Sequence, residues 1–297
     1  MPDLPPVGTR VSLRYRLPAG SVPPLSDVVG HLLDVAPIIR VRTKSGAVVD
    51  VSPVDVVAVR ALTDAPVRTS QIRNLEHAAA LAWPGLEQQW LDGWLLRFSG
   101  GHSHRANSAV PLEVHASLTA LPGIVDWYRA RGVTPWLAVP DRVVRLPDRA
   151  ATALESLVMT SALGPSTAEP AAVSPRPDEQ WLRIYARDVD VDVLTSVLDG
   201  ELGFATRADA AVGRCAVTPA PDGTRWAGLA GVRVDERRRR EGHARALCSA
   251  LMGWAAGRGA TRAYVQVLSD NDAAASLYRS MGFTTQHRVH YVDGRTL

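Results

Sequence analysis

Short strands dominate the hydrophobic pattern of the first 64 residues. In residues 7–16, Val11, Leu13 and Tyr15 alternate with polar residues, a period of two that is typical of a strand with one buried face. Four further apolar stretches are separated by turn residues, and they span residues 28–33, 38–42, 47–51 and 56–60. Five short strands in succession predict a small SH3-like β-barrel over residues 1–64. Such a barrel either binds a peptide or nucleic acid, or serves as a packing or dimerisation module.

Residues 70–165 show both helical and strand periodicity. Ser70 can cap a helix over residues 71–82, which Trp83-Pro84 ends. The elements that follow are predicted in the order strand, strand, helix and strand, at residues 93–98, 106–112, 122–131 and 135–139. These elements predict an α/β unit.

A stretch rich in Pro, Ala and Ser, residues 166–177, has no periodicity and is the clearest linker in the chain. Beyond it, residues 178–297 form the last predicted unit. Its strands are predicted at residues 213–218, 226–234, 263–268 and 284–291, and its helices at residues 189–198, 242–257 and 272–281. Helices that alternate with the strands of one central sheet make an α/β layer architecture.

Composition narrows the class of protein. The 297 residues are 46% hydrophobic, and no apolar run approaches the roughly 18 residues that a membrane span needs. The first residues, Met-Pro-Asp-Leu-Pro-Pro, lack the features of a secretory signal, and Cys215 and Cys248 stand apart, as free thiols of a cytoplasmic protein do. The sequence contains no cluster of Cys and His residues that would indicate a metal site.

Charge adds little evidence for a nucleic-acid partner. The net charge is +3, and all basic residues but Lys44 are arginines, a bias that indicates a GC-rich genome. The densest basic run, Arg237–Arg240, coincides with a turn that has its own chemical explanation. The sequence therefore does not favour nucleic-acid binding, and it leaves the oligomeric state open, a homo-oligomer included.

That turn, Arg239–Ala244, has the spacing Arg-x-x-Gly-x-Ala between a predicted strand and a predicted helix. The first N–H groups of a helix lack partners, and the helix dipole favours negative charge there. Gly242 lets the backbone approach a phosphate, and Arg239 and Arg240 add charged donors. A pyrophosphate has the charge and acceptors for such a site, although similar turns also begin helices that bind no ligand.

A second segment, residues 271–283, has the pattern Asn-x-x-Ala-x-x-Leu-Tyr-x-x-x-Gly-Phe. In this order and spacing, the two segments closely resemble the acetyl-CoA site of the GCN5-related N-acetyltransferases, the GNAT superfamily. The resemblance covers residues 181–297 and implies a central mixed sheet flanked by helices. It also implies transfer of an acetyl group from acetyl-CoA, the cosubstrate, to a small-molecule or peptide amine.

The resemblance assigns cofactor-binding residues in three places. The strand end that would bind the pantetheine arm and the acetyl carbonyl is Val232, Arg233 and Val234, and Asn271 would contact the same arm. The pyrophosphate turn comprises Arg239, Arg240, Glu241, Gly242, His243, Ala244 and Arg245. Asn271 is also a good N-cap for the following helix, and the two roles are compatible. The order of elements in residues 70–165 predicts either a degenerate GNAT-like half without the phosphate turn or a plain α/β extension.

Tyr278 is the catalytic candidate. Transfer of acetyl to an amine expels a thiolate, and a phenol that stays protonated at neutral pH can supply its proton. In the context of the Asn-x-x-Ala-x-x-Leu-Tyr pattern we interpret Tyr278 as the general acid of a direct ternary-complex reaction. The alternative is a tyrosine that only covers the core.

The general base is not evident. The strand before the phosphate turn, residues 226–234, contains no acid, although many GNAT enzymes use a Glu there. The candidates elsewhere are Glu201, Asp209, His287 and His290. A chain of water molecules, or an amine that arrives neutral, would remove the need for a base. The missing acid leaves a rival interpretation, a non-catalytic acyl-CoA sensor whose barrel binds a partner.

Two further predictions concern the site. Residues 175–297 are expected to bind acetyl-CoA by themselves, because the turn and the strand end lie within this fragment. The acceptor is expected to lie against residues 70–165, whose loop carries a cluster of polar side chains, His102, His104, Arg105 and Asn107. The alternative is a solvated polar loop without a binding role.

Overall fold

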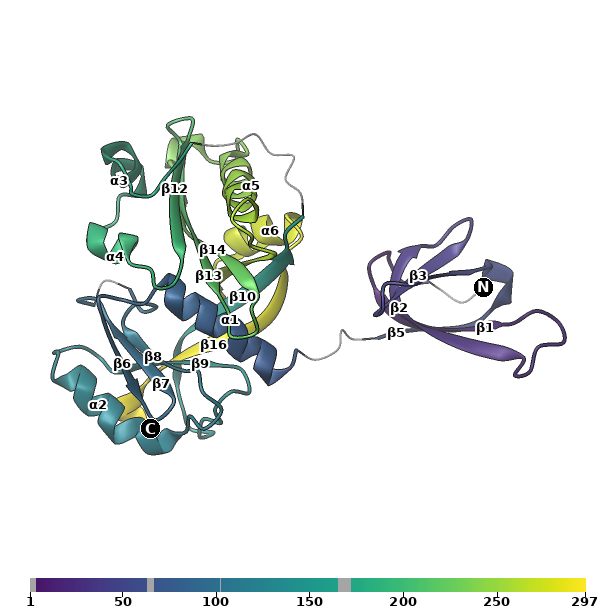
Figure 1. Cartoon of the computed structure of the whole chain (residues 1–297), viewed down its shortest axis with the longest axis horizontal. Coiled ribbons are helices and arrows are strands. Elements are labelled where there is room, and N and C mark those ends of the chain that lie inside the picture. The colour runs from purple at the N-terminus through teal and green to yellow at the C-terminus, as the bar shows by residue number, and fades with distance from the viewer. Residues whose placement is uncertain (1–3, 63–66, 102, 165–171) are drawn as a thin grey trace. The chain divides into compact units, whose positions relative to one another are not determined.

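The computed structural model describes residues 4–62, 67–101, 103–164 and 172–297. The chain forms two compact units, Met1–Pro66 and Val67–Leu297 (Figure 1). Each unit has its own hydrophobic core.

The N-terminal unit is a five-stranded antiparallel sheet in the order β4-β3-β2-β1-β5. Its strands are β1 (Arg10–Arg16), β2 (Leu25–Asp34), β3 (Ile39–Thr43), β4 (Val48–Val51) and β5 (Val56–Ala61). Val11 and Leu13 are fully buried while Arg14 is exposed, so the predicted alternation is confirmed. The five strands lie where the pattern places them, and their closure into an SH3-like barrel stays a prediction.

The second unit holds six helices and eleven strands among its described residues. The helices are α1 (Thr69–Ala82), α2 (Leu121–Arg129), α3 (Glu179–Tyr185), α4 (Val191–Thr195), α5 (His243–Ala256) and α6 (Asp272–Ser280). The first strands are β6 (Glu87–Leu91), β7 (Trp94–Phe98), β8 (Ser108–Pro111), β9 (Trp136–Pro140), β10 (Thr152–Ala162) and β11 (Val173–Ser174). The others are β12 (Glu201–Arg207), β13 (Ala211–Pro219), β14 (Arg225–Val234), β15 (Arg262–Leu268) and β16 (Thr284–Asp293).

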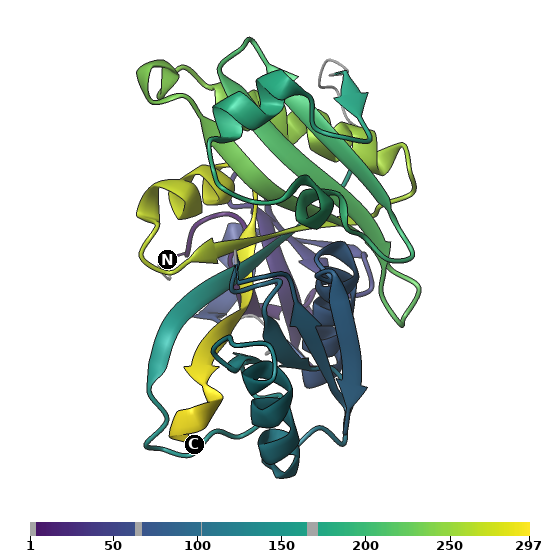
Figure 2. The same cartoon turned by 90° about the vertical axis from the view of Figure 1, so that its left-hand side faces the viewer.

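All eleven strands belong to one sheet, in the order β11-β12-β13-β14-β15-β10-β16-β9-β8-β7-β6. The long strand β10 lies between β15 and β16 and pairs with both, as Figure 2 shows for β10 and β16. The compact unit therefore extends across the expected linker. Residues 166–171 lie outside the described part of the chain, and β11 in the remainder of the linker pairs with β12.

Binding of acetyl-CoA by residues 175–297 alone stays a prediction, and the sheet order bears on how it can be tested. That fragment lacks β10, so β15 and β16 would each lose a hydrogen-bonded neighbour in the middle of the sheet. Unpaired backbone groups at a buried strand edge are costly. Binding experiments therefore require the full chain.

The two halves of the sheet repeat one order of connections. Strands β12, β13 and β14 are antiparallel, and α5 then leads to β15, which is parallel to β14. In the other half, β6, β7 and β8 are antiparallel, and α2 leads to β9, which is parallel to β8. The prediction that residues 70–165 are a degenerate GNAT-like half is compatible with this order and stays a prediction.

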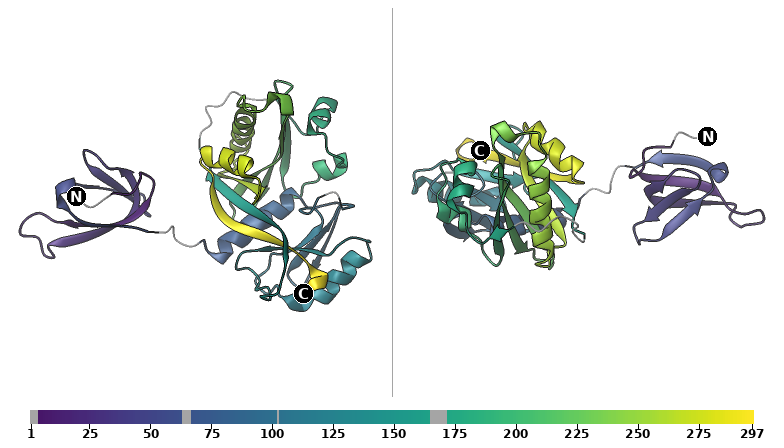
Figure 3. Two further views of the ribbon diagram at one scale, coloured as in Figure 1. Left: turned by 180° about the vertical axis from the view of Figure 1, so that it is seen from behind. Right: turned by 90° about the horizontal axis from the view of Figure 1, so that it is seen from above.

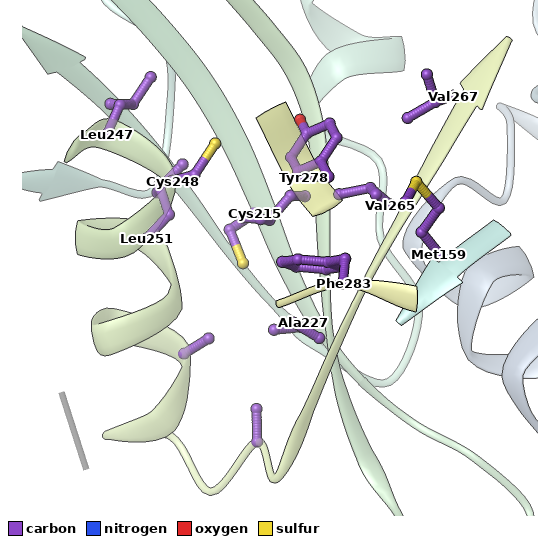
Figure 4. Packing of buried hydrophobic residues seen from close by; sticks show 14 of the residues in the cluster. Met159, Cys215, Ala227, Leu247, Cys248, Leu251, Val265, Val267, Tyr278 and Phe283 are labelled. Carbon is purple, nitrogen blue, oxygen red and sulfur yellow. The ribbon is translucent and has the colours of Figure 1, made fainter. Parts of the chain in front are cut away.

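Helices cover both faces of the C-terminal half of the sheet. Helix α5 packs on β12, β13 and β14 (Figures 1 and 3). Through other residues, α3 contacts the same three strands and α1 contacts β13 and β14. In the core under α5 and α6, Tyr278 and Phe283 lie edge to face with ring centroids 5.5 Å apart (Figure 4). Cys215 and Cys248 are free and fully buried in this core, and burial raises the pKa of each thiol to about 12.

Several element boundaries differ from the predictions. Helix α1 begins at Thr69 with Arg68 as its N-cap residue, so Ser70 lies inside the helix. The helix expected over residues 189–198 is only Val191–Thr195, and its C-cap residue Ser196 is extended. Strand β10 and helix α3 gave no recognised sequence signal, because the strand has no clear alternation and the helix is only seven residues long.

Two buried arginines hold the C-terminal end of α1. Arg214 donates to Ala82 O at 2.8 Å, Leu194 O at 2.7 Å and Ser196 O at 2.9 Å, and it is fully buried. Arg97 donates to Trp83 O at 3.2 Å and to Ser108 O at 3.3 Å. The last carbonyls of a helix lack internal partners and carry partial negative charge, which cations stabilise. The two arginines thus hold the end of α1, and Arg214 also binds carbonyls at the end of α4.

In the part of the chain that the structure describes, no helix is long and apolar enough to cross a membrane. The same residues include no group of three or more His, Cys, Asp and Glu side chains arranged to hold a metal ion.

Candidate functional site

Strands β14 and β15 pair along only part of their length. The parallel pairing begins at Trp226 and Arg262 and ends at Leu229 and Val265. Beyond that point, Gly231 has a φ of +61° and the register of β13 against β14 shifts, so β14 bulges away from its neighbour. The two strands therefore separate, and backbone groups at the end of β14 are left free to bind a ligand.

A cavity of about 570 Å³ occupies this separation. Its lining includes the end of β14, the end of β15 and the first turn of α6. The other wall comes from residues distant in sequence: Trp83, Ser103, His104, Arg105, Tyr185, Arg187, Asp188 and Tyr291. Its size is in the range of small-molecule sites.

The three predicted cofactor residues at the end of β14 have different surroundings. Val232 and Arg233 line the cavity. Val234 lies one residue further along, pairs with Ala211 and packs at the edge of the core under α5.

The predicted pyrophosphate turn begins α5 as expected. Gly242 is the N-cap residue with a φ of +82°, and a Cβ placed there would meet no atom within 4 Å. Among the described residues, no side-chain cap hydrogen bond is made at the start of α5, so its first N–H groups lack a capping partner. This arrangement, with Ala244 as the second helical residue, can accept an anion at the helix N-terminus.

The charged side chains around the turn are partly paired with each other. Arg239 binds Glu236 at 3.0 Å, and Glu241 binds both Arg238 at 2.9 Å and His243 at 3.0 Å. Hydrogen bonds from Arg238, then from His243, hold the pKa of the Glu241 carboxyl below its usual range. Glu241 therefore orders the turn rather than facing an anion.

Two more predicted residues have different surroundings. Arg240 has a φ of +69° and is exposed, which leaves its side chain near the open turn. Arg245 instead donates to Ser280 O at 3.1 Å, so it ties α5 to the end of α6.

Asn271 has the position that both of its predicted roles require. Its Oδ1 accepts the N–H of Ala274 at 3.1 Å, which makes it the N-cap residue of α6. The residue also lines the cavity, as does Ala274. The N-cap role is confirmed, and contact with pantetheine stays a prediction.

Tyr278 lines the cavity from the core side and is only 6% exposed. Burial, with a hydrogen bond to the Cys248 thiol, raises the pKa of its hydroxyl well above the usual value of 10. Figure 4 shows Tyr278 together with Cys248 and Phe283 in this core. The phenol is therefore protonated throughout the neutral range, which a general acid requires.

The loop after β7 contributes to the cavity as predicted, but not through every residue. His104 and Arg105 line it, while His102 lies outside the described residues. Asn107 is buried, and its Oδ1 accepts the N–H groups of Ser99 at 2.7 Å and Gly101 at 3.0 Å. It shapes the loop instead of facing an acceptor.

None of the four base candidates from the sequence lines the cavity. Glu201 binds Arg258 at 3.0 Å, and His290 binds Asp141 at 2.9 Å. His287 is buried with its Nε2 2.9 Å from Oε1 of Glu76. Asp209 accepts a hydrogen bond from Gln180 on the outer part of α3.

Two titratable side chains of the cavity were not among the base candidates from the sequence. His104 has ring contacts with Trp136 and Tyr291, at centroid distances of 5.2 and 5.9 Å, and partial burial lowers the pKa of its imidazole below 6.5. Asp188 is exposed at the cavity edge. An Asp within a loop gives no signal by itself, whereas the Gly- and His-rich loop had indicated His104 as a cavity residue.

Protein-family models match both units. A model described as the C-terminal part of the probable histone acetyltransferase Rv0428c matches residues 69–292. A second, described as the Rv0428c N-terminal Sm-like domain, matches residues 5–60. The described strands of the N-terminal unit are therefore those of an Sm-like domain.

Two relatives extend along much of the chain. The sequence is 50% identical over 303 residues to the probable histone acetyltransferase Rv0428c of Mycobacterium tuberculosis, covering 100% of this chain and 98% of that protein. It is 26% identical over 262 residues to the uncharacterized N-acetyltransferase YobR of Bacillus subtilis, covering 74% of this chain and 97% of that protein.

Solved structures share the fold at low sequence identity. A GCN5-related N-acetyltransferase from Kribbella flavida has a TM-score of 0.53 at 15% identity and covers 77% of this chain and 96% of its own. A GNAT-family acetyltransferase from Novosphingobium aromaticivorans has a TM-score of 0.50 at 16% identity, with coverages of 72% and 95%. These likenesses confirm the predicted α/β fold with a mixed sheet.

Proposed function

Because the chain belongs to the Rv0428c family of GNAT acetyltransferases, we propose that it transfers the acetyl group of acetyl-CoA to a primary amine by direct attack in a ternary complex. One observation carries the proposal: the separation of β14 and β15 opens into a cavity that Asn271 and Tyr278 share. The family assignment does not support the rival interpretation of a non-catalytic sensor. The name of the tuberculosis relative points to a histone lysine as one acceptor to include in tests.

The residues present fit acetyl-CoA in two ways. Free backbone groups near Val232 and Arg233 can bind the amide groups of a pantetheine arm. The uncapped first turn of α5, with the exposed Arg240 beside it, can bind a pyrophosphate. When bound, acetyl-CoA supplies the thioester that the amine attacks.

Tyr278 then has a chemical task. Attack by the amine breaks the bond from the acetyl carbon to sulfur, and the thiolate that leaves needs a proton. The protonated phenol lines the cavity, and its hydroxyl forms a hydrogen bond with the sulfur atom of Cys248. We expect it to donate to the CoA sulfur in the same manner.

His104 is the better candidate for the base. An acceptor ammonium must lose a proton before it attacks, and a neutral imidazole can take that proton directly or through water. His104 lines the cavity, and its lowered pKa keeps it neutral at pH 7. Asp188, which also lines the cavity, is the alternative.

The pH dependence of kcat/KM tests this assignment. Since His104 acts when neutral and its pKa lies below 6.5, wild-type activity should persist at pH 6.5 and fall only at lower pH. His104→Gln should lower kcat/KM at pH 7 by about 10²-fold or more and remove this acid limb. If Asp188→Asn removes the limb and His104→Gln does not, the base is Asp188.

Binding of acetyl-CoA is tested through the turn. Gly242→Glu places a carboxylate where the pyrophosphate is expected and forces a side chain into a φ of +82°. We expect acetyl-CoA at about 100 times its Kd to stabilise the wild-type chain by roughly 2.7 kcal/mol in thermal unfolding, and the variant hardly at all.

Gly223→Glu is the matched control. Gly223 also has a positive φ, of +81°, with no atom within 4 Å, but it lies in the turn between β13 and β14. It should lose stability to a similar degree while keeping the stabilisation by acetyl-CoA. Equal stabilisation of the Gly242→Glu and Gly223→Glu proteins by acetyl-CoA would place the pyrophosphate elsewhere.

A further inference from the structure

Arg105 lines the cavity without a carboxylate partner. Its Nη2 donates to Gln266 O at a long 3.4 Å, and its Nε is buried with no hydrogen-bond partner. A buried guanidinium N–H without an acceptor is costly. The position therefore suits a bound group that supplies the missing acceptor.

Two buried arginines, Arg97 and Arg214, increase the need of Arg105 for an anionic partner. The guanidinium carbons of Arg214 and Arg105 lie 4.2 and 6.0 Å from the ring centroid of Trp83. Burial, above all, lowers the pKa values of Arg97 and of Arg214, the latter to about 10, and the charge of Arg105 contributes to both shifts. Arg105 thus repels both Arg97 and Arg214. Glu76, whose negative charge favours the charged form of Arg97, is already bound to His287.

The described lining of the cavity carries more positive than negative side chains. Its lining includes Arg105, Arg187 and Arg233, and none of these forms an ion pair with a described carboxylate. Asp188 is the one acidic residue of the lining. A cavity with excess positive charge favours an anionic ligand.

The anion is expected near the reacting groups. Arg105 lines the cavity together with Tyr278 and Tyr291. Its positive charge partly offsets the rise that burial causes in the pKa of each of these two hydroxyls. Gln266 lies next to Arg105, since its backbone O accepts from Arg105 Nη2, and it also lines the cavity. Its Oε1 is buried without a partner among the described residues and can accept from an ammonium group. An acceptor for the amine and a donor for an anion therefore lie next to each other.

We propose that the acceptor is a small amino-acid-like molecule, with a primary amine and a carboxylate, and that Arg105 binds the carboxylate. The inference rests on the proposed acetyl transfer and adds the class of acceptor. A carboxylate is planar and matches the donors of a guanidinium. Trp83, Tyr185 and Tyr291 supply apolar surface beside it for the remainder of the acceptor.

Two other anions or acceptors fit less well. The phosphates of acetyl-CoA are expected at the α5 turn, whereas Arg105 lines the cavity together with Tyr278. A lysine side chain within a basic peptide carries no carboxylate near its amine, and its neighbouring positive charges would be repelled by the arginines of the cavity.

The test compares matched acceptors on the full-length protein. The protein amino acids are each offered beside their α-carboxamides, together with a lysine peptide blocked at both ends, and release of free CoA is measured. We expect at least one amino acid to be acetylated with a kcat/KM about 10–100-fold above that of its carboxamide. Arg105→Gln should abolish this preference, and Arg105→Lys should restore part of it.

Arg129→Gln is the control, because Arg129 is exposed on α2 and its loss changes the net charge equally. Acetyl-CoA binding to each variant is measured by thermal shift, and binding of the amino acids to the CoA complex by calorimetry. A carboxamide or blocked peptide acetylated as well as the amino acids overturns the carboxylate proposal while acetyl transfer stands. The carboxylate proposal is also overturned if the Arg105→Gln protein binds acetyl-CoA more weakly but keeps its preference for the amino acid over the carboxamide.

If acetyl-CoA binds and no amine accepts the acetyl group, the proposed function fails. The calorimetry then decides the inference separately. Binding of an amino acid that Arg105→Gln weakens at least tenfold supports the carboxylate site, and the absence of such binding overturns it.

Discussion

Tyr278→Phe should lower kcat by about 10²–10⁴ and leave the affinity for acetyl-CoA nearly unchanged. The substitution keeps the ring that packs on Phe283 and removes only the hydroxyl. That hydroxyl is the protonated donor of the cavity wall, since burial holds its pKa well above 10. The rate is best measured in a single turnover, where product release does not contribute.

Cys248→Ala provides the matched control for this variant. It removes the hydrogen-bond partner of the Tyr278 hydroxyl but leaves the proton donor in place. We expect less than a tenfold change in kcat, because the phenol can then turn to the CoA sulfur alone. If Tyr278→Phe keeps the wild-type single-turnover rate, Tyr278 is a packing residue and the thiolate leaves without its help.

The raised pKa of Tyr278 also predicts the basic side of the pH profile. A phenol whose pKa lies above 10 loses its proton only above that pH, so its contribution to kcat should persist through pH 9. A basic limb below pH 9 that disappears in Tyr278→Phe would contradict the assignment.

Arg214→Met should lower the free energy of unfolding by about 3 kcal/mol or more. Three carbonyl oxygens, of Ala82, Leu194 and Ser196, lose their donor in a fully buried site. Each unsatisfied buried acceptor costs roughly 1–3 kcal/mol, and removal of the desolvated cation offsets only part of the sum. Chemical denaturation of the full chain gives the change.

Arg129→Gln serves again as the comparison, since an exposed arginine of a surface ion pair should change stability by less than about 0.5 kcal/mol. The Arg214→Met protein should also loosen the contact of α1 with α4, because the carbonyls of both segments share this one guanidinium. A loss below about 1 kcal/mol would show that burial of the charge costs nearly as much as its hydrogen bonds contribute.

The sequence by itself determined the features whose causes lie within a few residues. Asn271 caps α6 because its side chain reaches an N–H three residues on, and Gly242 begins α5 because glycine adopts a positive φ without strain. The alternation in Val11 and Leu13 likewise fixes which face of β1 is buried. Periodicity, capping and turn chemistry are local, so they can be recognised in one chain.

Only the tertiary structure decided what faces the reacting groups. Arg105 meets Gln266 across 161 positions of sequence, and His287 meets Glu76 across 211, because the order of strands in the sheet brings them together. The insertion of β10 between β15 and β16 joins the two halves and makes the isolated C-terminal fragment incomplete. Whether a polar side chain lines a cavity or is paired in the core depends on these distant neighbours. Residue type alone therefore could not show that Arg105 and His104 line the cavity while Asn107 and His287 are buried.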